Sequence, residues 1–320
     1  MKQLSVIIPV HNAEVSLERC LDSLCGADDR LEVIVVNDES SDRSMDIAED
    51  FKNRFPSDVV IIDSDLKGTG DCFLSGVHSA TGRYLKLARP ADRFRRDQIR
   101  PVIDKLEDSG ADVFITGRRT INTRTGEMSD LSPVVSCNNR QIDMIKLQDK
   151  YEDFHNCLEF SCLCYKTEFL REQEFHPEKN NDSIYQEYSI LPFIFAQSMM
   201  IIPEILYEQV IDRERGHAYS FSEIRRVIGV YRSHKPLGKS RDEFLRKRIA
   251  KMILKNYAAF LVDSHEKKEG RRKAAELKEY LDQTEPSLAK LTDRKYKLMK
   301  RLGKYRIASK LGKLHKMSGM

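Results

Sequence analysis

The chain has 320 residues, of which 40% are hydrophobic and 32% charged, and its formal net charge is +4. This composition excludes a disordered, collagen-like or disulfide-stapled protein, and the length predicts about two domains of roughly 150 residues each. Seven cysteines, an odd number, predict free thiols in a reducing compartment.

Short apolar, β-branched runs alternate with stretches of helical periodicity in the N-terminal half. The predicted strands cover residues 4–8, 31–36, 59–62, 84–88 and 112–116. Apolar residues recur at helical spacing between them, in the segments that begin near residues 17, 45, 70 and 99. Strands separated by single helices form right-handed βαβ units, so we predict an α/β fold with a mostly parallel sheet flanked by helices.

Polar and charged residues follow four of the predicted strands. They lie at 9–12, 37–42, 67–71 and 89–93. Ligands of such sheets bind beyond the carboxyl ends of the strands, so these residues form the candidate site. Neither a Gly-x-Gly-x-x-Gly fingerprint nor a phosphate-loop lysine motif follows the first strand. The pattern therefore argues against a dinucleotide-binding or phosphate-loop protein.

Four stretches carry a resemblance to a known family. Ser-Val-Ile-Ile-Pro-Val-His-Asn at 5–12 is similar to its opening strand and Pro-x-x-Asn turn, and Val-Val-Asn-Asp-Glu-Ser-Ser-Asp at 35–42 to its Val-Asp-Asp-Gly-Ser-x-Asp nucleotide loop. Ala-Thr-Gly-Arg-Tyr-Leu at 80–85 resembles the lead-in to its Asp-x-Asp site, and Pro-Glu-Ile-Leu-Tyr at 203–207 its closing strand. The chain thus resembles the family-2 inverting glycosyltransferases of GT-A fold, of the bacterial cell-envelope type.

The resemblance implies an enzyme that moves a sugar, with inversion, from a nucleotide-sugar donor to a glycan or polyol-phosphate acceptor. A UDP-sugar is the favoured donor. In this family a Mg²⁺ or Mn²⁺ ion held by carboxylates screens the leaving diphosphate, and a further carboxylate deprotonates the acceptor hydroxyl. The rival interpretation is a catalytically inactive GT-A domain that binds nucleotide, glycan or a partner enzyme.

The candidate donor-binding residues, some implied by the resemblance and others by departures from the family pattern at the glycine-rich turn and the metal motif, lie at strand ends and in an arginine segment after the closing strand. They are Pro9, Val10, Asn12, Asp38, Lys67, Gly68, Arg89, Arg213 and Arg215. Asp38 is expected to accept a hydrogen bond from the base of the donor, and the alternative is that its loop only caps the next helix. A plain turn at Lys67 and Gly68 stays open, as does a solvated charge run at Arg213 and Arg215.

The metal motif departs from the family pattern. Its Asp-x-Asp-Asp sequence is expected at residues 89–92, which read Arg-Pro-Ala-Asp. Asp92 alone remains to ligate Mg²⁺ or Mn²⁺, together with waters and the donor's phosphates. Alternatively, Arg89 or Arg93 neutralises the diphosphate directly. Upstream, the family's donor-contacting Ala-Arg-Asn is missing, because residues 72–76 read Cys-Phe-Leu-Ser-Gly.

The general base is expected where the family has a Glu-Asp pair at the start of a helix that lines the acceptor cleft. Gln186 and Glu187 occupy that region, and Glu187 is the candidate base. The alternative is an ordinary surface acid on an amphipathic helix. Glu152 and Asp153 are outside candidates that lie early in the chain.

Strand patterns end near residue 218. We therefore predict a GT-A domain over 1–218 and a helical region over 219–320, with helical periodicity through 222–231, 245–260 and 274–281. The tail 291–320 holds ten Lys and Arg residues against one acid, so the first 290 residues carry a net charge of −5.

The basic tail suits the anionic inner face of a plasma membrane. The alternative is a solvated helix that docks on the body or on a partner. No secretory signal is expected at the N-terminus, and the longest apolar run, 190–202, is interrupted by Pro192 and too short to span a bilayer. These features predict a cytoplasmic, peripheral protein without a nucleic-acid-binding motif, and they leave the oligomeric state open.

Overall fold

The computed structural model describes residues 1–64, 67–133, 140–144, 151–173, 184–211, 221–264 and 267–302. The chain divides into two compact units, Met1–Asp212 and Arg213–Met320. The expected domain boundary at residue 218 falls among residues 212–220, which lie outside the described residues, so its exact place stays a prediction.

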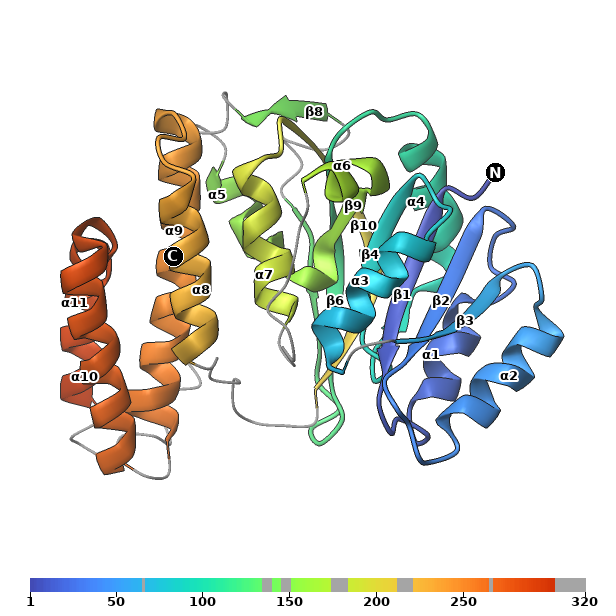
Figure 1. The fold of residues 1–320 in the computed structure, drawn as a ribbon, viewed down its shortest axis with the longest axis horizontal. Coiled ribbons are helices and arrows are strands. Elements are labelled where there is room, and N and C mark those ends of the chain that lie inside the picture. The colour runs from blue at the N-terminus through green and yellow to red at the C-terminus, as the bar shows by residue number, and fades with distance from the viewer. Residues whose placement is uncertain are drawn as a thin grey trace. The chain divides into compact units, whose positions relative to one another are not determined.

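A 10-stranded sheet, counted over the described residues, forms the centre of the first unit (Figure 1). Eight strands follow one another across it, in the order β3 (Val59–Asp63), β2 (Leu31–Asn37), β1 (Leu4–Val10), β4 (Tyr84–Leu87), β9 (Leu163–Lys166), β6 (Val113–Asn122), β10 (Ser198–Ile211) and β5 (Arg93–Phe94). In addition, β7 (Met128–Leu131) pairs with β6, and β8 (Arg140–Asp143) pairs with β10.

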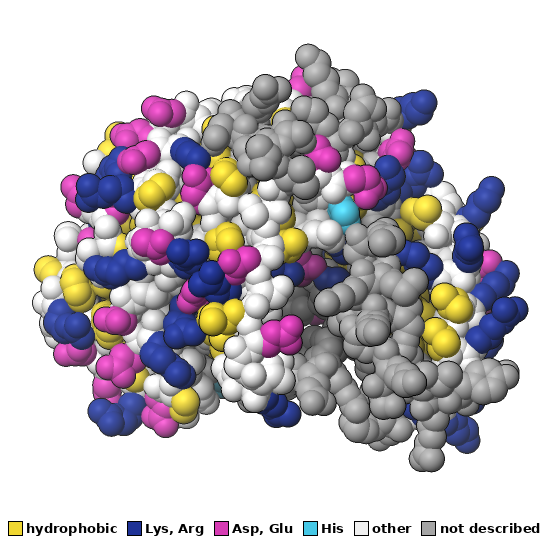
Figure 2. Space-filling model, turned by 180° about the vertical axis from the view of Figure 1, so that it is seen from behind, with side chains coloured by type: hydrophobic (Ala, Val, Ile, Leu, Met, Phe, Trp, Pro, Cys, Tyr) yellow, Lys and Arg dark blue, Asp and Glu magenta, His cyan; other side chains and the backbone are white. Residues whose placement is uncertain are grey.

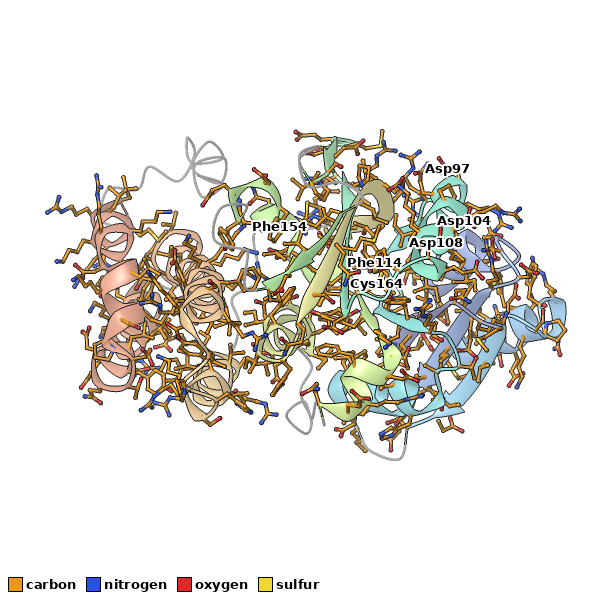
Figure 3. All side chains as sticks on the ribbon, turned by 90° about the horizontal axis from the view of Figure 1, so that it is seen from above. Asp97, Asp104, Asp108, Phe114, Phe154 and Cys164 are labelled. Atoms are coloured by element: carbon orange, nitrogen blue, oxygen red, sulfur yellow. The ribbon has the colours of Figure 1, made fainter. Side chains whose placement is uncertain are left out.

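Helices cover both faces of this sheet. One face carries α3 (Thr69–Ser79), α6 (Thr167–Glu172) and α7 (Ile184–Ile190), and the other carries α1 (Leu17–Leu24), α2 (Ser44–Arg54) and α4 (Arg96–Glu107) (Figures 1 and 3). The short α5 (Tyr151–Phe154) precedes two single 3₁₀ turns, His155–Cys157 and Phe160–Cys162. Figure 3 labels the exposed Asp97 and Asp104 of α4, the exposed Asp108 just after it, and Phe114 and Cys164, which pair across β6 and β9.

The strands form where the apolar runs predict them, and every residue of β1 is buried because helices cover both faces. One acid, Glu32, is nevertheless buried in β2. It accepts hydrogen bonds from the Ser5 hydroxyl at 2.5 Å, the Thr81 amide at 2.9 Å and the Thr81 hydroxyl at 2.8 Å. A Cβ on Gly82 would lie 2.6 Å from the Ser5 Oγ, so the glycine of the Ala-x-Gly-x-Tyr motif permits this close approach.

The predicted α/β fold and the C-terminal helical region are confirmed, and the helices and strands predicted for residues 4–116 are present. The sheet itself is mixed and not mostly parallel. β1 pairs in parallel with β2 and β4, whereas β9 pairs antiparallel with both β4 and β6. β9 lies at the middle of the sheet, just before α6 in the chain, but the chain does not reach it through a βαβ crossover. The alternation of helices and strands in the sequence does not reveal this.

The second unit is helical. It contains α8 (Phe221–Ser233), α9 (Lys239–Ala258), a π-helical turn (Ala259–Asp263), α10 (Lys267–Thr284) and α11 (Pro286–Leu302). Leu245, Ile249 and Ile253 are fully buried, as their helical spacing predicts. None of the helices in the described part of the chain is long and apolar enough to cross a membrane.

The ion pair between Asp28 and Arg30 makes the stability of the first unit depend on pH in the acidic range. Its carboxylate accepts two hydrogen bonds of 2.9 Å from the Arg30 guanidinium, and these hydrogen bonds lower the pKa of Asp28 from 3.8 to about 2. Because the folded-state pKa lies below the unfolded value, the stabilisation is present above about pH 4 and is lost as the pH falls towards about 2. Over this pH range, the free energy of unfolding measured in urea should fall by on the order of 1 kcal/mol less for Asp28→Asn than for the wild type.

The exposed neighbour Asp29 provides the matched control for this pH series. Asp29→Asn should follow the wild-type curve. An Asp28→Asn curve parallel to that of the wild type would show that the Arg30 link contributes no pH dependence.

Candidate active site

The ends of β1 and β2 lie side by side and are joined through their backbones. Pro9 and Val10 are buried in β1, where Val10 is in register with Asn37 of β2. The Val10 carbonyl accepts hydrogen bonds from the Asp38 amide at 2.8 Å and from the Ser40 hydroxyl at 3.2 Å. Val10 therefore fixes the start of the loop that contains Asp38.

Asn12 fixes the end of the same loop. Its backbone adopts a φ of 48°, a left-handed conformation that asparagine tolerates better than most residues. Its side-chain oxygen accepts hydrogen bonds from the amides of Ser41 at 2.8 Å and Asp42 at 3.3 Å. Asp42 in turn accepts a hydrogen bond from the Ser44 amide at 3.0 Å, so Asp42 supports the start of α2.

Asp38 does not support that helix. Its carboxylate oxygens lie 3.0 and 3.2 Å from the Gly68 amide, which donates to them from the loop before α3. Gly68 has a φ of 104°, a conformation that favours glycine. Lys67 forms a 2.6 Å ion pair with Glu39, and both side chains are exposed. The structure thus brings Asp38, Lys67 and Gly68 together at one edge of the sheet.

Glu39 occupies the position at which the family's nucleotide loop has glycine. Its φ of 52° is left-handed, which costs an ordinary residue roughly 1 kcal/mol. The loop has therefore kept the backbone shape that glycine favours although the residue has changed.

Arg89 and Asp92 form a bidentate ion pair just beyond β4. The guanidinium donates from Nε to the Asp92 Oδ2 at 2.7 Å and from Nη2 to Oδ1 at 2.8 Å. The Tyr207 hydroxyl donates to the Asp92 Oδ2 at 2.6 Å, and the Val210 amide donates to Oδ1 at 2.8 Å. Burial lowers the pKa of Arg89, but the hydrogen bonds and charge of Asp92 outweigh it and hold that pKa above its usual value.

This arrangement decides whether Asp92 fits a metal. A carboxylate offers about four acceptor positions, and the four hydrogen bonds to Asp92 fill them. The side chain of Asp92 is also completely buried. Asp92, the expected metal ligand, therefore positions Arg89 instead, and it does not fit the Mg²⁺ or Mn²⁺ site that the family resemblance implies. The described ranges contain no group of three or more His, Cys, Asp or Glu side chains that could hold a metal ion.

A buried lysine lies beneath this pair. Lys86 of β4 is fully buried, and its ammonium donates to the carbonyls of Ser161 at 2.8 Å, Leu163 at 3.2 Å and Phe160 at 3.4 Å. Burial lowers the pKa of Lys86. The three carbonyls compensate for lost hydration, so Lys86 holds the chain around Phe160 against the sheet.

The Phe160 ring connects Arg89 to α7. The Arg89 guanidinium lies 5.4 Å from the centre of that ring, and the Tyr185 ring of α7 lies 4.5 Å from it. Glu187 is two positions beyond Tyr185, roughly 200° around the helix, and it is fully buried. The alternative of an ordinary surface acid is therefore wrong. The role of Glu187 as a base stays a prediction.

The predicted residues and the described site differ at four positions. Arg213 and Arg215 fall outside the described residues. Sequence reasoning did not assign roles to Tyr207, whose hydroxyl contacts Asp92, or to Lys86. The signal for Lys86 was a charged residue inside an otherwise apolar strand, which is rare unless the charge is paired or hydrogen-bonded.

The described structure is an α/β protein whose candidate site lies beyond the ends of β1, β2 and β4. Residues 5–169, just over half of the 320, match the family model described as Glycosyl transferase family 2. The chain therefore belongs to glycosyl transferase family 2, and the resemblance noted in the sequence is confirmed.

Two curated relatives illustrate the similarity. The poly(ribitol-phosphate) beta-N-acetylglucosaminyltransferase TarS of Staphylococcus aureus is 22% identical over 244 residues, which cover 72% of this chain and 40% of TarS. The minor teichoic acid biosynthesis protein GgaB of Bacillus subtilis is 22% identical over 199 residues, which cover 60% of this chain and 21% of GgaB. The aligned part thus spans less than half the length of either relative.

Solved structures share the fold. TarS residues 1–349 in complex with UDP-GlcNAc superpose with a TM-score of 0.68 at 15% identity, covering 93% of this chain and 90% of that structure. The mannosyltransferase PcManGT of Pyrobaculum calidifontis, in complex with GDP-Man and Mn²⁺, superposes with a TM-score of 0.53 at 16% identity, covering 98% and 87%. At these identities the similarity concerns the fold alone.

Proposed function

We propose that this chain is a glycosyltransferase that moves a sugar from a nucleotide-sugar donor, UDP-sugar favoured, to an acceptor hydroxyl with inversion. The acceptor oxygen forms a bond to the sugar's C1 while the bond from C1 to the diphosphate oxygen breaks. The electron pair of that bond leaves with the nucleoside diphosphate, and the proton of the acceptor hydroxyl passes to Glu187. The observation that carries this proposal is the family match over residues 5–169, which includes all the strand ends of the site.

The donor is proposed to lie across the ends of β1, β2 and β4. Asp38 would accept a hydrogen bond from the base, because its carboxylate has acceptor capacity beyond the Gly68 amide. Pro9 and Val10 would shape that pocket from the end of β1, and Asn12 would do so through its side-chain hydrogen bonds to the loop. Lys67 and Arg89 would face the phosphates, as would Arg213 and Arg215 in the part of the chain that the structure does not describe.

The acceptor is proposed to be a glycan or polyol-phosphate polymer of the cell envelope. The names of two relatives support this class, since TarS acts on a poly(ribitol-phosphate) and GgaB serves minor teichoic acid biosynthesis. The inactive-domain interpretation is not favoured by these relatives. It would require a site that binds no nucleotide or turns over no donor.

Nucleotide binding tests the donor site. Asp38→Ala should weaken binding of both UDP and uridine by about tenfold or more, because a hydrogen bond to a carboxylate contributes about 1.5–3 kcal/mol. Calorimetry on the full chain measures the two affinities. The exposed Asp46 of α2 gives the control Asp46→Ala, which should bind like the wild type. If neither UDP, GDP nor CDP binds to the wild-type chain, the proposed function is wrong.

We also propose that the chain contacts the anionic inner surface of a membrane through α11. Leu291 and Leu298 are 51% and 49% exposed, and they lie two helical turns apart on the same face. Arg294, Lys295 and Arg301 are exposed around them, and none of the three has an ion-pair partner among the described residues. Figure 2 shows Lys and Arg side chains at the edge formed by α10 and α11, with hydrophobic side chains between them.

Vesicle binding tests this contact. Leu291→Ser with Leu298→Ser should weaken binding to vesicles of phosphatidylcholine with phosphatidylglycerol by about tenfold or more, since each buried leucine contributes about 1.5–3 kcal/mol. The matched control changes Val15 and Met128, which are 83% and 63% exposed in the first unit, to serine. Equal binding of all variants would contradict insertion. If the chain instead binds a soluble polyanion equally well with and without these leucines, α11 binds an acidic polymer.

A further inference from the structure

The contacts of Asp92 disagree with the metal site that the family resemblance implies, and the same contacts give Arg89 a defined position. Asp92 is fully buried and neutralised, whereas the Arg89 side chain remains 29% exposed. Nε and Nη2 of Arg89 donate to Asp92, Nη2 also donates to the Val210 carbonyl at 3.4 Å, and Nη1 has no hydrogen-bond partner among the described residues. The guanidinium therefore keeps donors available on the edge that faces away from Asp92.

Three contacts fix the orientation of that guanidinium. The bidentate pairing with Asp92 sets its plane, and the Tyr207 hydroxyl accepts from the Arg89 amide at 3.2 Å while donating to Asp92. The Phe160 ring lies 5.4 Å from the guanidinium carbon. A guanidinium held in one orientation loses little entropy when it binds a second oxyanion, and its planar fork matches phosphate oxygens.

The position of Arg89 is next to the proposed donor pocket. β1 and β4 are parallel neighbours, with Ile7 opposite Leu87, and the Ala88 amide donates to the Ile7 carbonyl at 2.9 Å. Arg89 is the next residue, so it lies beside the end of β1, where Pro9 and Val10 begin the donor pocket. A diphosphate that extends from a base at Asp38 across β1 would reach this edge.

The surroundings of Arg89 carry positive charge. Arg118 lies close enough to Arg89 to interact with it and forms a 3.8 Å ion pair with Glu159, and the Lys86 ammonium interacts with the Asp92 carboxylate. The pKa of the Cys162 thiol also depends on these positive charges. Burial raises the pKa of its thiol, but the hydrogen bond with Cys157 and the charges of Arg118 and Lys86 outweigh it and bring that pKa to about 7. Such an environment attracts an anion and opposes a divalent cation.

We propose that Arg89, held by Asp92 and Tyr207, binds the diphosphate of the donor in place of a divalent cation, so that this chain binds its donor without metal. Arg89 is the binding residue, and Asp92 and Tyr207 are positioning residues that act through it. The proposal rests on the function proposed above and assigns to the protein itself the task of compensating the charge on the leaving diphosphate.

Calorimetry with the full chain tests this proposal, with UDP and uridine as probes in excess EDTA and again in Mn²⁺ or Mg²⁺. We expect the affinity for UDP to differ by less than about threefold between EDTA and metal. Arg89→Gln should weaken UDP binding by about tenfold or more and leave uridine binding unchanged, since only UDP carries the phosphates. Arg89→Lys should recover part of the loss. The control Arg95→Gln removes a guanidinium that pairs with Asp97 at 2.8 Å outside the site, and it should bind both probes normally.

The outcomes separate this inference from the proposed function. UDP binding that requires Mn²⁺ or Mg²⁺, or that is unchanged in Arg89→Gln, overturns the role of Arg89 and leaves the glycosyltransferase proposal standing. Absence of UDP, GDP and CDP binding under every condition overturns the proposed function instead. Asp92→Asn adds a further check if it folds, because loss of the carboxylate that positions Arg89 should weaken binding of UDP and not of uridine.

Discussion

Replacement of Glu187 by glutamine is expected to lower kcat by about 10²–10⁴-fold, the usual contribution of a general base. Glutamine keeps the size and the buried position of the side chain but accepts no proton at neutral pH. Donor affinity should stay within about twofold of the wild-type value, because the base acts on the acceptor hydroxyl. Single-turnover assays with a UDP-sugar and a polyol-phosphate polymer, together with UDP calorimetry, measure the two effects.

A matched substitution on α6 controls for this experiment. Glu168 is 74% exposed and pairs only loosely with Lys166 at 3.6 Å, so Glu168→Gln should leave kcat unchanged. Thermal unfolding establishes that Glu187→Gln is folded, which matters because Glu187 is completely buried. Undiminished turnover by a folded Glu187→Gln enzyme would exclude this residue as the base and return attention to Glu152 and Asp153.

Lys86→Met should lower the free energy of unfolding by about 2–4 kcal/mol, the largest loss of stability that we expect from any of these substitutions. Methionine has a similar length but donates no hydrogen bond, so the carbonyls of Phe160, Ser161 and Leu163 would be left buried without their donor. Each unsatisfied buried acceptor costs about 1–3 kcal/mol, and the hydration energy regained by removing a buried charge offsets part of the sum. Urea unfolding followed by fluorescence measures the change.

The half-buried Lys52 of α2 provides the control, because no hydrogen bond or ion pair holds its ammonium in the described structure. Lys52→Met should change the free energy of unfolding by less than about 0.5 kcal/mol. A Lys86→Met protein as stable as this control would show that the three carbonyls find other partners, such as water. In that case Lys86 would not be needed to hold Phe160 beneath Arg89.

The sequence predicted the first half of the fold well because its signals are local. The runs at 4–8 and 31–36 are apolar throughout, which is typical of parallel strands covered on both faces, and both are buried in β1 and β2. The antiparallel insertion of β9 between β4 and β6 was not predicted. It depends on contacts between residues far apart in the chain, for which a four-residue strand gives no periodic signal.

The candidate site was predicted only in part. The strand-end rule directed attention to Asp38, Arg89 and Asp92, whose roles stay predictions, and it could not say what each side chain contacts. The place of Asp92 in a motif predicts a metal ligand, whereas in the structure Arg89, Tyr207 and Val210 donate hydrogen bonds to its oxygens. Glu187 was open to interpretation as a surface acid, and its burial is a property of the packed α7.

The sequence by itself determined the alternation of strands and helices, the family, and the set of polar residues at the carboxyl edge of the sheet, because these follow from periodicity and from motifs of adjacent residues. Only the tertiary structure decided how those residues are used. Tyr207 lies 115 positions from Asp92, yet its hydroxyl is 2.6 Å from the carboxylate. Whether a carboxylate meets a cation of the protein or remains free for a metal depends on such distant neighbours, since hydrogen bonds and charges act over a few ångströms of space and not along the chain.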